Sequence, residues 1–423
     1  MSTNTAEAIP KIPQKIANDP RARVWAGGFL VVGVLVGLLG SLLIAWQYHI
    51  DTDPRIVGLH FLALNLGYVI AVAITQRLLG HVSIRFVALL GCGIGFASLL
   101  ALSFAAPPAS PLWRILGLGF VGWAGGALVT ALLYVLEPRF EESPASVANL
   151  AGALFGFGCL ISTLMGGFTY FAGSVQRETA LLALIPLIFF VLYALNKYPG
   201  ALGVVRHASE QAAIRETLRD LRSVAAVLFS LLLFFQFGSE WAIAGWLPLF
   251  LIHKLGANPV WAIFALALYF LSIMVGRLLA RRLLPRVSHK KLLVGSIVVA
   301  MAGYLLLSFT RSMPGAWLAS VVIGAGFAPI YPLVEESLDD RFSYHPGFYN
   351  GIFSIAITGG MSAPWLLGYV DAYLGIQYVM LLPALGSIAV LILTLLIMLE
   401  AHLMGGSKSR IEPKASAAAA GKS

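Results

Sequence analysis

Long apolar runs, separated by short polar loops, fill almost the whole chain. Each run is close to the roughly 20 residues that a helix needs to cross a bilayer. The runs lack the short alternating pattern of membrane β-strands. The sequence therefore predicts an all-α integral membrane protein with twelve transmembrane helices, over residues 24–46, 56–75, 86–106, 115–136, 147–172, 179–195, 224–252, 260–279, 292–309, 314–334, 348–367 and 378–399.

Two loop sequences occur twice, at a nearly constant interval of about 200 residues, which is the signature of an internal repeat. The sequence RLLGHVSIR that begins at Arg77 returns as RLLPRVSHK at Arg282. A second set returns in the same order: Arg139, Phe140, Pro144 and Asn149 correspond to Arg341, Phe342, Pro346 and Asn350. The repeat predicts two pseudo-symmetric six-helix bundles. Many secondary transporters are built in this way, with the substrate site where the halves meet.

The repeat and the polar segments divide the chain into five parts. We expect six-helix bundles at 24–196 and 224–404, joined by a cytoplasmic linker at 197–223 that carries an amphipathic surface helix. Residues 1–23 form a cytoplasmic N-terminal segment, and residues 405–423, rich in Ala, Ser and Lys, form a disordered cytoplasmic tail.

Composition and charge add an orientation. The chain is 59% hydrophobic and 11% charged, far below the roughly 25% charged residues of soluble domains. Of the 28 Lys and Arg residues, 23 fall on the side of the N-terminus and five on the other. The positive-inside rule then places both termini in the cytoplasm, and we expect a multi-pass protein of a bacterial inner membrane. The net charge of +9 reflects this topology and attraction to membrane lipids, so nucleic acid is not an expected partner.

Enzyme and metal chemistry find no support in the residue pattern. The chain has no phosphate-cradling loop, its Gly-x-Gly pairs lie inside apolar spans, and its histidines lack metal-ligand spacing. The two cysteines, Cys92 and Cys159, both fall within spans and cannot form a disulfide framework. We therefore expect a protein that is not an enzyme and has no cofactor or bound metal. A channel fits the duplicated halves less well than alternating access does.

One buried carboxyl stands out. Glu240 lies near the middle of the seventh span, where an ionisable group is costly and by default functional. Gln236 shares its helical face, and Trp241 and Trp246 bring aromatic surface. An acid, an amide and an indole can grip a polyol, and desolvation would let the acid take up a proton. The alternative is that Glu240 only bonds a neighbouring helix.

The whole chain resembles the major facilitator superfamily, with twelve spans in two halves, a long central linker and basic motifs in the second and eighth loops. The sequence GSE at 238–240, followed by GWLP at 245–248, is similar to the fucose-permease-like and related sugar transporters, as is APIYP at 328–332. The fifth span lacks the Gly-Pro pair of drug exporters, having Ser162 and Thr163 at that place. This departure weakens a drug-antiport interpretation.

The resemblance implies a monomeric secondary transporter that works by alternating access. We expect proton-coupled uptake of a small polar solute, with a monosaccharide as the first candidate. The alternatives are a drug or metabolite exporter working by proton antiport and a facilitator without ion coupling. Substrate-binding or coupling candidates are Glu240, Gln236, Trp241, Trp123, Tyr331, Asn65 and Tyr269, of which Trp123 and Tyr331 belong to helices that line the cavity in this superfamily. Packing or helix-to-helix hydrogen bonding is the alternative for the last four.

Opposite charges near the cytoplasmic face suggest a gate that closes when they meet. The basic members are Arg77, Arg85, Arg277, Arg281 and Arg282, and the acidic members of the second half are Glu335, Glu336, Asp339 and Asp340. Asn149 and Asn350, at equivalent positions of the repeat, are assigned to the same role. The alternative is that the basic cluster only sets topology and the acids are solvated.

Overall fold

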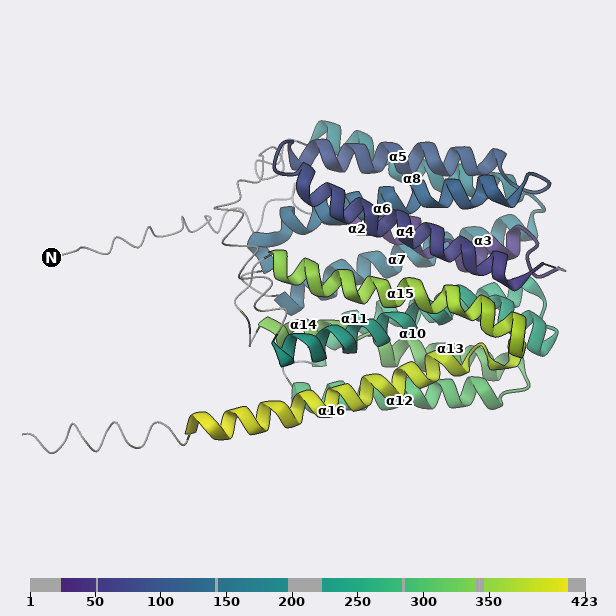
Figure 1. The fold of residues 1–423 in the computed structure, drawn as a ribbon. Coiled ribbons are helices and arrows are strands. Elements are labelled where there is room, and N and C mark those ends of the chain that lie inside the picture. The colour runs from purple at the N-terminus through teal and green to yellow at the C-terminus, as the bar shows by residue number, and fades with distance from the viewer. Residues whose placement is uncertain are drawn as a thin grey trace, which may run out of the picture.

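The structure, a computed structural model, describes residues 24–50, 52–140, 144–196, 223–283, 286–339, 342 and 346–409. Within these residues every regular element is a helix, and the helices run side by side as one elongated bundle (Figure 1). The described chain begins and ends at the same end of this bundle, here called the terminal end. The opposite end, which carries residues 46–50, is called the distal end.

The helices follow one another in the order expected of twelve spans. In the first half they are α2 (Gly28–Gly37), α3 (Leu39–Ala45), α4 (Pro54–Leu78), α5 (Ile84–Phe104), α6 (Pro111–Phe140), α7 (Pro144–Phe171) and α8 (Val175–Leu195). In the second half they are α10 (Val224–Leu255), α11 (Pro259–Leu283), α12 (His289–Phe309), α13 (Met313–Phe327), α14 (Ile330–Asp339), α15 (Pro346–Leu374), the short 3-10 helix η2 (Ile376–Tyr378) and α16 (Leu381–Ser409).

Most of these helices are long and apolar enough to cross a membrane. Ten pass on length and composition within the described residues, and an eleventh is counted when the pair α2–α3, bent by 42°, is taken as one span. The 29-residue α15 stands where the eleventh span was predicted. The predicted all-α membrane fold is confirmed, and each predicted span coincides with a helix or a broken helix pair.

Local sequence explains where several helices begin and end. Ser83 and Ser223 cap α5 and α10, since each side chain accepts a hydrogen bond from a backbone N–H of the first turn. Asp53 does the same for α4, whose first residue is Pro54. Gly256 ends α10 in the left-handed conformation, with φ of 62°, which glycine adopts without steric cost.

The helices of the first half pack closely through small residues. The α4–α6 contact is extensive, and a Cβ on Gly122 would overlap the backbone oxygen of Leu64. A Cβ on Gly126 would likewise overlap the oxygen of Tyr68. The two helices therefore touch backbone to backbone, as is common where helices pack inside a bilayer.

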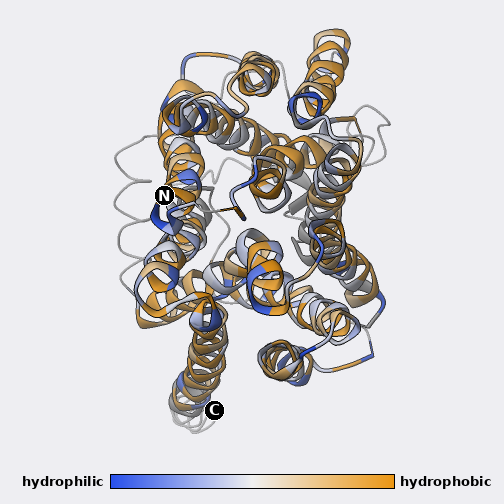
Figure 2. Cartoon of the chain, turned by 90° about the vertical axis from the view of Figure 1, so that its right-hand side faces the viewer, coloured by the Kyte–Doolittle hydropathy of each residue, from blue (hydrophilic) through white to orange (hydrophobic). Residues whose placement is uncertain are grey.

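The outer faces of the helices are apolar and exposed. Phe120 is 61% exposed, Phe168 66% and Leu385 52%. Figure 2, a view along the helices from the distal end, shows apolar ribbon predominating. Such a surface suits lipid, because soluble proteins rarely expose apolar patches of this extent.

Several helix pairs join the two halves. The long pairs α4–α15 and α7–α11 run between them, and α3 packs against α10 in the distal part of the molecule. The distal contact is tight, since a Cβ on Gly40 of α3 would overlap the backbone oxygen of Ala244 in α10. The interface between the halves therefore contains the middle of α7, α10 and α11.

Candidate functional site

Two polar side chains lie one turn apart on the buried face of α10. Gln236 is fully buried and Glu240 is 8% exposed. The Gln236 Nε2 donates a hydrogen bond to Glu240 Oε2 over 2.6 Å. Because α10 is 32 residues long, both groups lie near its middle, far from the helix ends.

A cation from α11 meets this carboxyl. Arg277 Nη2 lies 3.4 Å from Glu240 Oε1, and the Arg277 residue is 7% exposed. Its Nη1 donates to the backbone oxygen of Gly152 in α7, at 2.8 Å. A Cβ on Gly152 would lie 2.6 Å from Nη1, so the absence of a side chain there makes room for the guanidinium. The ion pair therefore lies where the two halves of the protein meet.

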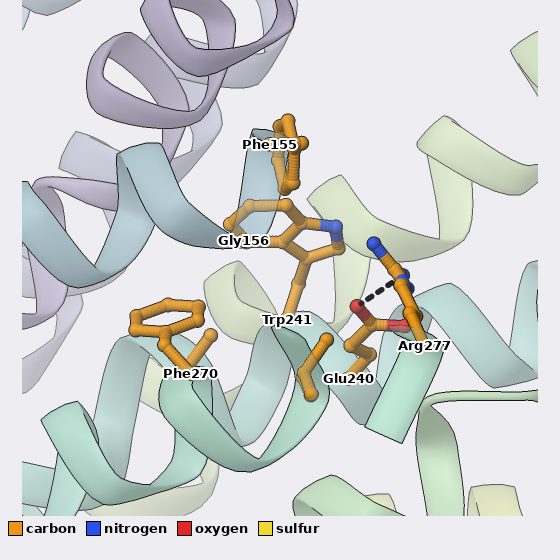
Figure 3. Close-up of a pocket in the computed structure, with 8 residues that line it drawn as sticks. Phe155, Gly156, Glu240, Trp241, Phe270 and Arg277 are labelled. Carbon is orange, nitrogen blue, oxygen red and sulfur yellow. Dashed lines mark hydrogen bonds and ion pairs between the residues drawn. The ribbon is translucent and has the colours of Figure 1, made fainter. Parts of the chain in front are cut away.

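A cavity adjoins the ion pair. It encloses about 230 Å³, its open side included, and is lined by Phe155, Gly156, Glu240, Trp241, Ala244, Phe270, Ile273 and Arg277. Glu240 and Arg277 lie on one side of it and Phe270 on the other, with Trp241 between them (Figure 3). The Trp241 ring meets Phe155 edge to face, with 5.8 Å between ring centroids. The cavity thus has one charged wall and one aromatic wall.

Hydroxyl groups from two further spans hold the backbone of α10 at this point. Tyr269 of α11 donates to the backbone oxygen of Glu240 at 3.1 Å, and Tyr304 of α12 donates to that of Ser239 at 2.9 Å. The Ser239 hydroxyl itself donates to the oxygen of Pro383 in α16, at 3.0 Å. These bonds fix the part of α10 from which Glu240 projects.

The ion pair is imperfect for a buried one. Charge-assisted N–H···O bonds are usually about 2.7–2.9 Å long, whereas the Arg277–Glu240 distance is 3.4 Å. Two buried atoms of the group, Gln236 Oε1 and Arg277 Nε, have no hydrogen-bond partner among the described residues. A buried pair of this kind adds little net stability.

A comparison with protein families identifies the chain. The model of the Major Facilitator Superfamily matches residues 24–363. The protein belongs to the Major Facilitator Superfamily. It is therefore a membrane transporter, and the resemblance suggested by the sequence is confirmed.

Individual members of the superfamily are distant in sequence. An uncharacterised transporter of Yersinia pestis is 22% identical over 370 residues, which cover 86% of this chain and 91% of the relative. The solved structure of FucP in the outward conformation is 21% identical with a TM-score of 0.66, and covers 89% of this chain and 98% of FucP. The nucleoside transporter NupG is 13% identical with a TM-score of 0.69, and covers 89% of this chain and 99% of NupG.

Apart from Glu240 and Trp241, the binding candidates predicted from the sequence lie outside the cavity lining. Trp246 is 1% exposed, donates its indole N–H to the oxygen of Pro364 at 2.9 Å, and stacks on Phe61. Asn65 donates to the Phe61 oxygen of its own helix at 2.8 Å. Half-buried Trp123 packs against the core, and the half-buried Tyr331 ring lies 5.6 Å from that of Phe237. The Tyr269 hydroxyl, as described above, donates a hydrogen bond to the backbone oxygen of Glu240.

The charged gate candidates are scattered. Arg277 pairs with Glu240, whereas Arg85 donates to the backbone oxygens of Tyr193 and Ala194. Arg77 and Arg282 are exposed. Glu335 is buried, and Glu336 Oε1 lies 3.5 Å from His289 Nδ1. Asp340 and the side chains of Arg281, Asp339, Asn149 and Asn350 lie outside the described residues.

Several residues of interest in this transporter were missed by the sequence analysis. Phe155, Gly156, Phe270 and Ile273 line the cavity from spans five and eight. The pair Gly152 and Gly156, one turn apart in α7, was the available signal, because it leaves a side-chain-free groove beside α11. A second buried carboxyl, Glu178 in α8, lies one residue before the predicted span 179–195. It is fully buried and accepts a bond from Thr169 at 3.4 Å.

Proposed function

We propose that the protein is a secondary active transporter that takes up a small polar solute, such as a monosaccharide, together with protons by alternating access. The observation that carries this proposal is the Glu240–Arg277 pair on the wall of a cavity between the two halves. Substrate sites of duplicated transporters lie at that interface. FucP, which a solved structure names a fucose:proton symporter, has the same fold and supports the proposal.

The chemistry of the cavity suits a small polyol. Trp241, Phe155 and Phe270 offer faces against which the C–H groups of a sugar ring can pack. Arg277 lines the cavity, and its Nε, which has no partner among the described residues, can donate to a hydroxyl oxygen.

Proton coupling follows from the carboxyl. A proton on Glu240 removes the negative charge that faces Arg277, and its loss restores the pair. Arg277 also donates to Gly152 in the other half. The charge on Glu240 therefore affects a contact between the halves, and proton binding biases the two conformations of the transporter.

Alternating access also needs a closed and an open side. The distal side is closed by α3 against α10 and by Trp246 against Phe61. We infer from the positive-inside rule that the distal end faces outward and that both termini are cytoplasmic, in a monomer of the inner membrane. Opening toward the outside then requires the α3–α10 contact to separate.

Uptake into proteoliposomes tests the function. A panel of labelled monosaccharides is offered with and without an inward proton gradient. We expect the gradient to drive accumulation of at least one sugar, and Glu240→Gln to abolish accumulation while keeping exchange of labelled for unlabelled sugar. Glu178→Gln, the same change at another buried carboxyl, serves as the control for loss of a buried carboxyl.

Three results would redirect the proposal. Full accumulation by Glu240→Gln would remove this residue from coupling. Gradient-driven expulsion of solute would favour the drug or metabolite exporter, and equilibration that ignores the gradient would favour the uncoupled facilitator.

A further inference from the structure

Arg277 uses only part of its hydrogen-bonding capacity. One terminal nitrogen donates to Gly152 and the other makes the long contact with Glu240, whereas the buried Nε has no acceptor among the described residues. The Nε and Nη2 groups form one edge of the planar guanidinium. With such an edge arginine binds a carboxylate through two parallel hydrogen bonds. Here Glu240 occupies that edge through a single oxygen.

The Glu240 carboxylate is held away from an ideal position. Its Oε2 is bound at 2.6 Å by Gln236, one turn earlier on the same helix, while Oε1 reaches Arg277 at 3.4 Å. The carboxylate is therefore shared between the Gln236 amide and the Arg277 guanidinium. It makes only one long contact with Nη2 and none with Nε. A free carboxylate entering the cavity could make both bonds at normal length.

Charge balance then links such a ligand to a proton. The remaining lining residues, from Phe155 to Ile273, are uncharged. The titratable groups that face the pair, Tyr269, Tyr304 and Cys159, are neutral acids at ordinary pH. An added anion would leave one uncompensated negative charge in a buried site, which is unfavourable. Protonation of Glu240 removes that charge.

We propose that the substrate is a small carboxylate, such as a sugar acid, which binds Arg277 in place of the Glu240 carboxylate while Glu240 holds one proton. This inference rests on the proposed function and specifies its substrate class. The aromatic wall packs against the apolar face of the ligand. One anion and one proton cross together, and on release Glu240 loses its proton and pairs with Arg277 again. Transport is therefore electroneutral.

Matched sugar pairs test the substrate class in the full chain. Galacturonate and galactose, and glucuronate and glucose, differ by a carboxylate in place of a hydroxymethyl group. Gluconate and pyruvate extend the panel to open-chain and short acids. In proteoliposomes we expect an inward proton gradient to drive uptake of at least one acid, at roughly tenfold or more the rate of its neutral partner. A membrane potential set with potassium and valinomycin should not change this rate.

Variants test the exchange of carboxylates. Glu240→Gln imitates the protonated residue, so it should bind the acid with an affinity that no longer depends on pH. Arg277→Lys keeps the charge but loses the fork, and should weaken acid binding by about tenfold or more. Arg277→Gln should abolish it. Because that change alone leaves Glu240 without its cation, the double variant Glu240→Gln with Arg277→Gln checks that loss of binding is not loss of folding.

The outcomes separate the two proposals. Proton-driven uptake of a neutral sugar with no binding of any acid would overturn the anion inference and leave the proposed function standing. Acid uptake that responds to membrane potential, or unchanged acid binding in Arg277→Gln, would also overturn it. Absence of proton-driven uptake for every sugar and acid would overturn both.

Discussion

Two tryptophans on one helix show how much a single position decides. Trp241 is half-buried and lines the cavity, whereas Trp246, five residues on, is sealed between α4 and α15. We expect Trp241→Ala to weaken substrate binding by about 1 kcal/mol or more, with Trp241→Phe milder. Trp246→Ala should instead lower the free energy of unfolding, by about 3–5 kcal/mol for a fully buried tryptophan. Binding titration and thermal unfolding in detergent measure the two effects, and equal affinity in Trp241→Ala and the parent would reject the cavity role.

At the residue scale, part of the candidate site could be predicted from the sequence. Glu240 and Gln236 were identifiable because a carboxyl and an amide one turn apart, in the middle of an apolar run, are costly and share a face. In the sequence Arg277 is a gate candidate because it clusters with Arg281 and Arg282 at the same membrane face as the acidic residues that close the tenth span. Its contact with Glu240 depends on how deeply α11 enters the interface and on the space at Gly152, neither of which a single sequence reports.

At the scale of elements, one arginine links two helices through hydrogen bonds. Arg85, in the first turn of α5, donates to the last carbonyls of α8, which have no partner within their own helix. Arg85→Gln should lower the free energy of unfolding by roughly 1.5–3 kcal/mol, the range for bonds that involve a charged group. Arg77, exposed at the end of α4, is the matched control, and Arg77→Gln should leave stability unchanged. Equal thermal unfolding of both variants would contradict the capping role.

Helix positions were predictable and helix breaks were not. An apolar run of about 20 residues predicts a span because hydrocarbon forces the backbone to bond to itself. No proline lies at the bend between α2 and α3 that would allow its prediction, although Gly37 and Gly40 lie beside it. The extra turn of α10 beyond residue 252 follows from Gly256, whose left-handed conformation sets the end.

At the scale of the whole molecule, the orientation in the membrane can be tested by labelling. Cys92 and Cys159 are both buried, so native thiols should give little background. Ser110 is exposed in the distal loop before α6, and Ser288 is exposed in the terminal loop before α12. We expect an impermeant maleimide to label Ser110→Cys but not Ser288→Cys on intact cells, and both after lysis. Labelling of Ser288→Cys but not of Ser110→Cys on intact cells would show that the distal end faces the cytoplasm.

The backbone contact between α4 and α6 has a consequence for how this chain can change over generations. At Gly122 and Gly126 even the smallest added side chain would collide with a carbonyl of α4, so neither position has a gradual route to another residue. Phe120, on the neighbouring turn, is 61% exposed toward lipid and can be exchanged for almost any apolar residue. Substitutions in α6 are therefore expected on its lipid-facing side, whereas the side that packs against α4 should change little.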